Sequence, residues 1–210
     1  MNSLQALWRP RDRCASLIKP LAIASVLLSA MALFAMLTDE VHEGDTRTLD
    51  VYVAKLALAG RARWPGLVGP MQDISGLGGV TVLTLMTAGC VGFLLLVRRR
   101  RTGLLAVASV VTGSVPVTAI KHIVARARPD ASLASGVFNG LSFPSGHASM
   151  SAVAHLTLGA LVASTRDERL ERIYILDAAF VATGLIGVSR VALGAHWTTD
   201  VLGGWLFGSA

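Results

Sequence analysis

The chain has 210 residues, of which 53% are hydrophobic and only 15% are charged, and its formal net charge is +6. Average soluble domains are about a quarter charged, so this composition excludes a disordered chain, a coiled coil and an ordinary water-soluble enzyme. Two cysteines are too few for a disulfide-stapled secreted scaffold. The positive charge would suit nucleic-acid binding, so its position along the chain matters more than its sum.

Long apolar runs predict membrane-spanning helices. Residues 20–37, 74–97 and 102–120 contain no charged side chain. Each run is long enough to cross a hydrocarbon core about 30 Å thick as a helix. Residues 144–165 and 173–189 add two more runs, and a short sixth run covers residues 197–210. We therefore predict an all-α polytopic membrane protein, with residues 20–210 forming one bundle of six transmembrane helices.

The first run follows a basic leader, residues 1–19, which raises the possibility of a cleavable signal peptide. Ala30-Met31-Ala32 imitates a cleavage site. The uncharged run is longer than a normal signal core, and the leader is long as well. These lengths favour an uncleaved membrane anchor.

Basic residues are concentrated in alternate connecting segments. Residues 1–19, 98–101 and 166–172 together hold 11 of the 19 lysines and arginines. By the positive-inside rule these segments, and with them the N-terminus, are expected on the cytoplasmic side of the inner (plasma) membrane. Membrane topology thus accounts for most of the positive charge, and no nucleic-acid partner is predicted.

Two outer segments are expected on the opposite side. Residues 38–73 begin with acidic side chains, and residues 49–58 then mix apolar and charged positions. This pattern predicts a helix that lies along the membrane interface, and a loop helix packed on the bundle is an equal alternative. Residues 129–143, rich in Gly, Ser and Ala, predict a long loop that borders a site.

Three cations fall at the predicted outer ends of the helices: Lys121, Arg128 and Arg190. Charged groups cost about 2.5–3.5 kcal/mol at the centre of a membrane helix, so their presence suggests a function. Lys121 and Arg128 are seven residues apart, about two helical turns, and are expected on one face of a helix. Three cations fixed at the same depth would repel one another unless they bind a polyanion, and the planar guanidinium group of arginine can donate two hydrogen bonds to phosphate oxygens.

The fourth predicted helix opens with Pro144-Ser145-Gly146-His147. A helix start offers free backbone N–H groups and the positive end of the helix dipole, both of which favour an anion. Gly146 would let the backbone approach the ligand closely. We expect Ser145 and Gly146 to contribute to the same phosphate site.

Two histidines and one carboxylate supply the chemistry. His196 and Asp200 are four residues apart and are expected on one face of the last helix. A carboxylate bound to one ring nitrogen makes the other nitrogen a better nucleophile, and His147 could protonate a leaving oxygen. These three side chains could also ligate a metal. Three neighbouring cations would repel a divalent ion, so we predict no metal and no other cofactor.

The residues, as spaced, resemble the type-2 phosphatidic acid phosphatase family of membrane lipid phosphatases, whose site is related to that of vanadium haloperoxidases. The resemblance covers residues 121–200, and residues 1–120 add only a compatible topology. The three motifs of the family are Lys-x6-Arg-Pro, Pro-Ser-Gly-His and Ser-Arg-x5-His-x3-Asp. In this chain they are Lys121 to Arg128-Pro129, Pro144 to His147, and Ser189-Arg190 with His196 and Asp200.

The resemblance implies a metal-independent phosphatase. His196 would attack phosphorus to form a phosphohistidine, Asp200 would orient it, and His147 would protonate the leaving group and then help water to hydrolyse the intermediate. The phosphoryl oxygens would be held by Lys121, Arg128, Ser145, Gly146 and Arg190. The expected substrate is a lipid phosphate monoester or diphosphate with its headgroup on the periplasmic side. Undecaprenyl diphosphate is favoured by family analogy, and phosphatidic acid and phosphatidylglycerophosphate suit the site nearly as well.

Two other functions are compatible with the same cations. One is a lipid-phosphate transporter or binding protein that performs no chemistry. The other is an oxidant that resembles the haloperoxidases and uses bound vanadate. Phosphate release from lipid phosphates and halide oxidation distinguish the three.

Overall fold

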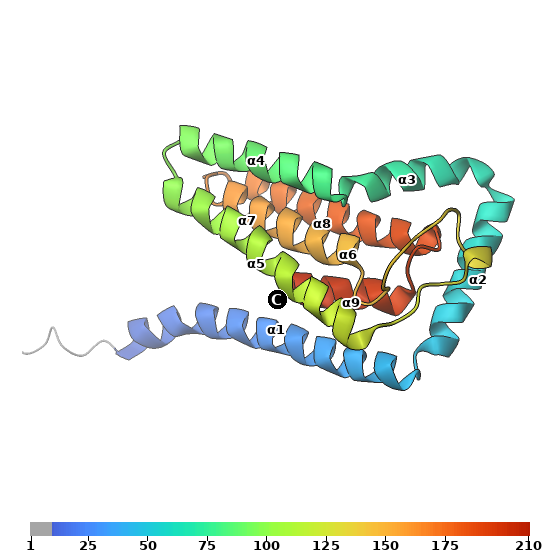
Figure 1. The fold of residues 1–210 in the computed structure, drawn as a ribbon. Coiled ribbons are helices and arrows are strands. Elements are labelled where there is room, and N and C mark those ends of the chain that lie inside the picture. The colour runs from blue at the N-terminus through green and yellow to red at the C-terminus, as the bar shows by residue number, and fades with distance from the viewer. Residues whose placement is uncertain (1–9) are drawn as a thin grey trace, which may run out of the picture.

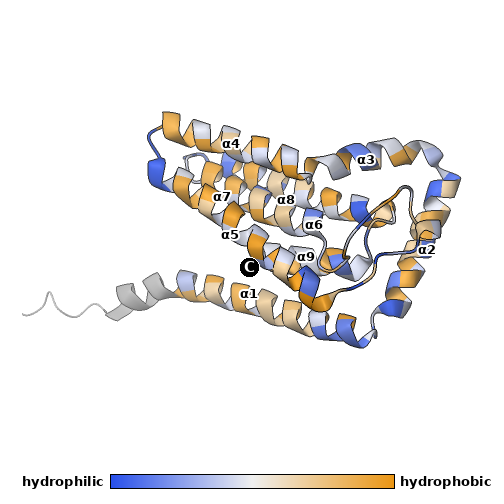
Figure 2. Cartoon of the chain, in the orientation of Figure 1, coloured by the Kyte–Doolittle hydropathy of each residue, from blue (hydrophilic) through white to orange (hydrophobic). Residues whose placement is uncertain are grey.

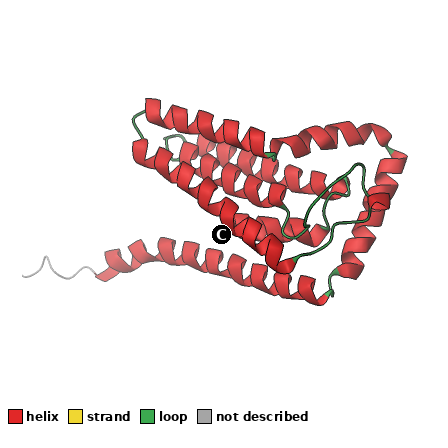
Figure 3. Cartoon of the chain, in the orientation of Figure 1, coloured by secondary structure: helices red, strands yellow, loops and turns green. Residues whose placement is uncertain are grey.

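The computed structural model describes residues 10–210, with side chains from Ile18 onward except Lys19, so residues 1–9 of the predicted leader lie outside it. Within this range the chain is helical and contains no strand (Figure 3), which confirms the all-α class. Three short segments are the 3-10 turns η2 (Pro65–Leu67) and η3 (Ala131–Leu133) and the π-helical η4 (Ala152–Leu156). The α-helices are α1 (Pro10–Glu43), α2 (Arg47–Arg63), α3 (Val68–Leu77), α4 (Val80–Leu96), α5 (Arg100–Val124), α6 (Gly146–Ser151), α7 (Thr157–Ala163), α8 (Arg169–Ala192) and α9 (Thr198–Ser209).

The long helices run roughly side by side, and α2 lies across one end of them (Figure 1). The loop from α5 to α6 and the turn from α8 to α9 are at this end, beside α2. The turns from α4 to α5 and from α7 to α8 are at the opposite end. The segments that carry the predicted site therefore gather at one end of the bundle.

Several helices have the length and composition of membrane spans. Three of them qualify, namely α1 from Pro20 to Glu43, α5 and α8, and the α3–α4 pair is a fourth if it forms one bent span. Apolar residues cover much of α1, α4 and α5 (Figure 2), and large side chains such as Leu85 and Leu104 are exposed. Outward apolar surface of this kind suits a lipid solvent, and the protein is a multi-pass membrane protein.

The second predicted span, residues 74–97, is not one straight helix. It breaks at Gly78 and Gly79, and α3 and α4 are bent by 46° relative to each other. A Cβ atom at Gly78 would lie 2.5 Å from Cγ2 of Ile186 and 3.4 Å from Cδ2 of His147. At the break, the backbone of Gly78 therefore packs directly against α8 and against His147, a residue of the predicted site.

Helix α2 confirms that residues 49–58 are helical. It contacts α8 and α9 and buries Asp50 and Ala54, so it packs on the bundle. Arg61 near its end donates hydrogen bonds to the backbone oxygens of Ala192 and Leu133, the latter at 2.6 Å. These bonds tie α2 to the end of α8 and to the long loop.

Glycines let α9 pack closely against α6. A Cβ at Gly204 would meet Ala148 Cβ at 2.8 Å, and one at Gly208 would lie 2.4 Å from the backbone oxygen of Ser149. Small residues allow membrane helices to approach in this way. At 1.5 Å per residue the 12 residues of α9 extend about 18 Å.

Candidate active site

His196 lies in the turn between α8 and α9 and is 3% exposed. Its Nδ1 is 3.4 Å from Asp200 Oδ2, and its Nε2 is 3.0 Å from Nη1 of Arg128. The expectation that His196 and Asp200 share a helix face is wrong, because Trp197 is extended and α9 begins only at Thr198. The turn nevertheless brings the imidazole and the carboxylate into contact.

Burial lowers the pKa of His196 to about 4, because an imidazolium in this turn would lose its hydration. The hydrogen bond to Asp200 raises the pKa and is the smaller effect. His196 should therefore stay neutral above about pH 4 and keep a lone pair for attack. Because the unfolded chain binds this proton more readily, stability should fall as the pH drops from about 6.5 toward 4.

Ring nitrogen resonances offer a direct measurement of this protonation state. We predict that the 15N shifts of His196, assigned by their loss in His196→Gln, report a neutral ring at about pH 6 in the ligand-free protein. A free imidazole is more than half protonated there. An imidazolium at that pH would contradict the assignment of His196 as a ready nucleophile.

The Asp200 carboxylate is fully buried and is held on both oxygens. Oδ2 accepts hydrogen bonds from the Ser142 hydroxyl and, at 2.8 Å, from the backbone N–H of Trp197. Oδ1 accepts a hydrogen bond from Nη1 of Arg126 at 2.7 Å. Neither Ser142 nor Arg126 was singled out by the sequence. Arg126 is only two residues from the motif arginine, and this proximity is the one signal that could have drawn attention to it.

Arg128 lies in the loop between α5 and α6, and not in a helix, and its side chain extends from there to His196. The prediction that Lys121 and Arg128 share a helix face is wrong, because α5 ends at Val124 and Ala125 has a left-handed backbone with φ 48°. The residue before Pro129 is also disfavoured in a helix. In the loop, Arg128 donates to the backbone oxygens of Ala195 at 2.7 Å and Gly140 at 3.1 Å. Burial lowers the pKa of this guanidinium, which a bound anion would counteract.

The other two cations approach from α5 and α8. Nζ of Lys121 donates to the backbone oxygens of Leu141 at 3.0 Å and Pro144 at 2.6 Å, so it also holds the loop in front of α6. Arg190 donates to Ser75 Oγ at 2.6 Å, and its guanidinium lies 5.2 Å from the centre of the Phe138 ring. Its Nε is buried and has no hydrogen-bond partner among the described residues.

The Ser145-Gly146-His147 segment forms the start of α6. Ser145 is the N-cap, its Oγ accepts the Ala148 N–H at 3.4 Å, and its own N–H donates to the backbone oxygen of Asp200 at 2.9 Å. Gly146 follows as the first helical residue, and a Cβ there would lie 3.8 Å from Lys121 Cε. His147 is close enough for four charged or ionisable groups to act on it electrostatically, and these are Arg190, His196, Arg128 and Lys121.

The structure thus brings all eight predicted site residues to one end of the bundle, where α5, α6, α8 and α9 meet. His155 in η4 is not part of this cluster, because its Nδ1 contacts the backbone oxygen of Ser151, one turn earlier at the end of α6, at 2.9 Å. Among the side chains that the structure describes, from Ile18 onward without Lys19, no three His, Cys, Asp or Glu residues are grouped as a metal site would require. The charged groups suited to an anion are Lys121, Arg128 and Arg190.

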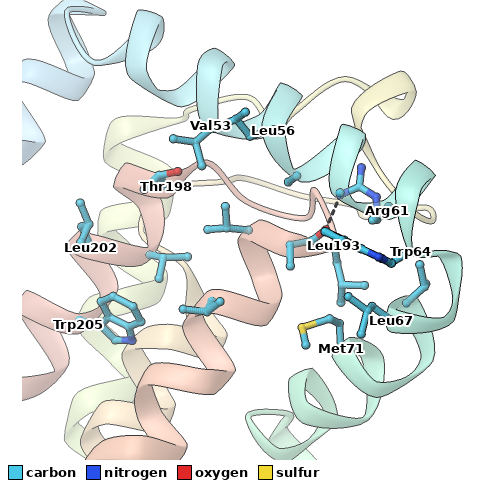
Figure 4. Close-up of a pocket in the computed structure, with 17 residues that line it drawn as sticks. Val53, Leu56, Arg61, Trp64, Leu67, Met71, Leu193, Thr198, Leu202 and Trp205 are labelled. Carbon is cyan, nitrogen blue, oxygen red and sulfur yellow. Dashed lines mark hydrogen bonds between the residues drawn. The ribbon is translucent and has the colours of Figure 1, made fainter.

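An apolar cavity of about 640 Å³ lies beside this cluster (Figure 4). It is bounded by α2, η2, α3, α8 and α9, and Trp64, Met71 and Trp205 are among its walls. Leu193 and Thr198, three residues before and two residues after His196, also line it. Apolar surface and the cationic cluster are therefore neighbours at this end of the molecule.

Known proteins resemble this chain in sequence and in fold. The family model of the PAP2 superfamily matches residues 102–210. Phosphatidylglycerophosphatase B of Bacillus subtilis is 29% identical over 187 residues, which cover 86% of this chain and 88% of the relative. Decaprenylphosphoryl-5-phosphoribose phosphatase of Mycobacterium tuberculosis is 31% identical over 148 residues, which cover 69% of this chain and 76% of the relative.

A solved structure agrees with these matches. The crystal structure of a transmembrane PAP2-type phosphatidylglycerolphosphate phosphatase from Bacillus subtilis superposes with a TM-score of 0.81 at 28% identity. The superposition covers 87% of this chain and 90% of that one. The fold and the matches define a membrane phosphatase of the lipid phosphatase class. The chain belongs to the PAP2 superfamily, which confirms the resemblance drawn from the three motifs.

Proposed function

We propose that this protein hydrolyses a phosphate monoester or diphosphate of a membrane lipid through a phosphohistidine intermediate. One observation carries the proposal: the buried imidazole of His196 touches a carboxylate through Nδ1 and an arginine through Nε2. The carboxylate of Asp200 fixes the proton on Nδ1, so that Nε2 keeps its lone pair, which accepts a hydrogen bond from Arg128 until a phosphoryl group takes that guanidinium. The guanidinium of Arg128, 3.0 Å from Nε2, is placed to bind an oxygen of a phosphoryl group on that nitrogen.

The reaction follows from these positions in two steps. Nε2 of His196 attacks phosphorus, the bond from phosphorus to the lipid oxygen breaks, and His147 gives its proton to that oxygen. Water then attacks phosphorus and displaces Nε2, while His147 takes up a proton from the water. Lys121, Arg128 and Arg190 stabilise the charge on the phosphoryl oxygens in both transition states.

We propose that the three cations make a metal unnecessary. The measurement is phosphate release from a short-chain phosphatidic acid in detergent, with and without excess EDTA. The expected result is undiminished turnover in EDTA together with inhibition by vanadate, which imitates the phosphoryl group in transfer. Loss of turnover in EDTA, restored by a divalent ion, would refute metal independence and revive the metal-site alternative.

The substrate class is supported by the neighbouring apolar cavity. Leu193 and Thr198, on either side of His196, line this cavity, and we propose that it takes the chain of a lipid whose headgroup binds at His196. The relatives with broad coverage are named for phosphorylated lipids, a phosphatidylglycerophosphate and a decaprenylphosphoryl phosphoribose. We therefore rank lipid phosphate monoesters such as phosphatidylglycerophosphate ahead of undecaprenyl diphosphate. A panel of these lipids and phosphatidic acid, compared by kcat/KM, determines the preference.

We also propose six membrane crossings, with the N-terminus and leader 1–19 in the cytoplasm and the site on the periplasmic side. The crossings would be α1, α3–α4, α5, α6–α7, α8 and the short α9, so that residues 20–210 form one membrane domain. The turns at residues 97–99 and 164–168 lie at the end opposite the site in Figure 1, and the arginines in these turns and in the first residues of α5 and α8 favour the cytoplasm. Helix α2 would then lie along the outer interface. Cysteine labelling from each side of the membrane tests this topology.

Two measurements separate the rival functions. A transporter or binding protein would bind lipid phosphates without releasing phosphate. An enzyme that resembles the haloperoxidases would oxidise halide when loaded with vanadate, whereas the phosphatase should be inhibited by vanadate and show no such oxidation.

A further inference from the structure

A second ion-pair network lies directly behind the Asp200 carboxylate and joins it to α2. Nη1 of Arg126 is 2.7 Å from Asp200 Oδ1, and Nη2 is 2.6 Å from Oδ2 of Asp50. Both carboxylates are buried, with exposed fractions of 0% and 1%. One guanidinium thus bridges two buried carboxylates that are 150 residues apart in the chain.

Asp50 is also bound to the first turn of α9. Its Oδ1 accepts the Thr199 N–H at 3.0 Å, and its Oδ2 accepts the Thr199 hydroxyl at 2.6 Å. A carboxylate at a helix N-terminus is stabilised by free N–H groups and by the helix dipole. Asp50 therefore fixes the start of α9, the turn of helix that carries Asp200.

The orientation of Asp200 depends on how its two oxygens are shared. Arg126 occupies Oδ1, which leaves Oδ2 for Ser142, the Trp197 N–H and His196 Nδ1. Without the guanidinium, Asp200 would be a buried carboxylate that has lost its cation, and such groups are costly until they rotate or take up a proton. Either response would weaken the contact that orients the imidazole.

We propose that Arg126 and Asp50 are positioning residues of the phosphatase reaction. Arg126 holds Asp200 as a carboxylate with Oδ2 toward His196, and Asp50 holds both Arg126 and the start of α9. This inference rests on the proposed phosphatase function. It makes α2, which lies outside the motif region, a part of the machinery that sets the reactivity of the nucleophile.

A double-mutant cycle tests whether Arg126 acts through Asp200. The variants are Arg126→Ala, Asp200→Asn and the two combined, and the readouts are kcat and KM for phosphate release. The expected result is a fall in kcat on the order of 10–100-fold for Arg126→Ala with KM nearly unchanged, the size seen when a group that orients a reacting ligand is removed. In the Asp200→Asn background the same change should cost little more, because its target is already altered.

Two comparisons make the cycle specific. Arg128→Ala should raise KM as well as lower kcat, since Arg128 faces the phosphoryl group. Free guanidinium ion should restore part of the kcat of Arg126→Ala and none of that of the double variant. Matched surface controls are Arg63→Ala and Asp45→Asn, whose side chains are exposed on or just before α2 and should leave kcat unchanged.

The possible outcomes are distinct. Full additivity in the double variant, or a rise in KM at constant kcat, would overturn the positioning role. If Arg126→Ala does not fold, Arg126→Lys and Asp50→Asn complete the same cycle; a single ammonium cannot bridge both carboxylates, so kcat should still fall. A wild-type protein that releases no phosphate would instead remove the proposed function, and that result is separate from any result of the cycle.

Discussion

His196→Ala is expected to abolish phosphate release while lipid phosphate binding persists. The nucleophile forms the bond to phosphorus, and removal of a covalent catalyst typically lowers kcat on the order of 10⁴–10⁶-fold. The three cations that would hold the phosphoryl group remain in this variant. Binding of a fluorescent short-chain lipid phosphate should therefore stay within about tenfold of wild type.

The matched control for this variant is His122→Ala. His122 is exposed on α5, directly beside Lys121, and makes no hydrogen bond among the described side chains. Its removal should leave kcat and KM at wild-type values. If His196→Ala retained wild-type turnover, the phosphohistidine mechanism would be wrong. If it lost binding and turnover together, His196 would be a ligand-holding residue and the transporter hypothesis would gain support.

The positions of the helices could be predicted from the sequence because apolar length is a local property. The runs at residues 20–37, 102–120 and 173–189 all lie within α1, α5 and α8. The break at Gly78-Gly79 was missed because the apolar run continues through it. Its physical reason is the close approach of Ile186 and His147, which are more than 60 residues away in the chain.

The motif residues could also be located from spacing, although two of the geometric arguments behind them were wrong. His196 precedes its expected helix, and Arg128 follows the end of its own. The motifs consist of residue types in a fixed order along the chain. This order holds whether a motif residue lies in a helix or in the turn beside it, so the motifs could be recognised although their predicted helical geometry was wrong. The structure brings the side chains together through turns that the sequence did not indicate.

Residues that act on the site from a distance could not be found in this way. Asp50 contacts Thr199 across 149 positions, and Arg126 contacts Asp200 across 74. A buried ion pair depends on which helices pack together, and single-sequence patterns carry no information on that pairing. Asp50 was therefore only one of two charged residues in the predicted outer helix at residues 49–58.

Gly204→Ala is expected to reduce kcat at least on the order of 10²-fold by moving α9 away from α6. The new Cβ would lie 2.8 Å from Ala148 Cβ and 3.0 Å from both the Ser145 oxygen and the Ser149 nitrogen. These are atoms of a continuous helix and cannot turn aside, so α9 itself must shift. Asp200 lies one helical turn before Gly204 and would move with it, away from the segment that carries His147. A displacement of about 1 Å can cost a reaction about 10²-fold.

The same overlap should lower stability by about 1–3 kcal/mol, as overpacking of a close contact does. Thermal unfolding in detergent, measured beside kcat, detects both effects. Gly89→Ala on α4 is the matched control, because a Cβ there has no atom within 4 Å and alanine is the better helix former. The control should keep full activity and unfold at the wild-type temperature or slightly above it. Wild-type kcat in Gly204→Ala would mean that the nucleophile and the proton donor do not depend on the contact between α6 and α9.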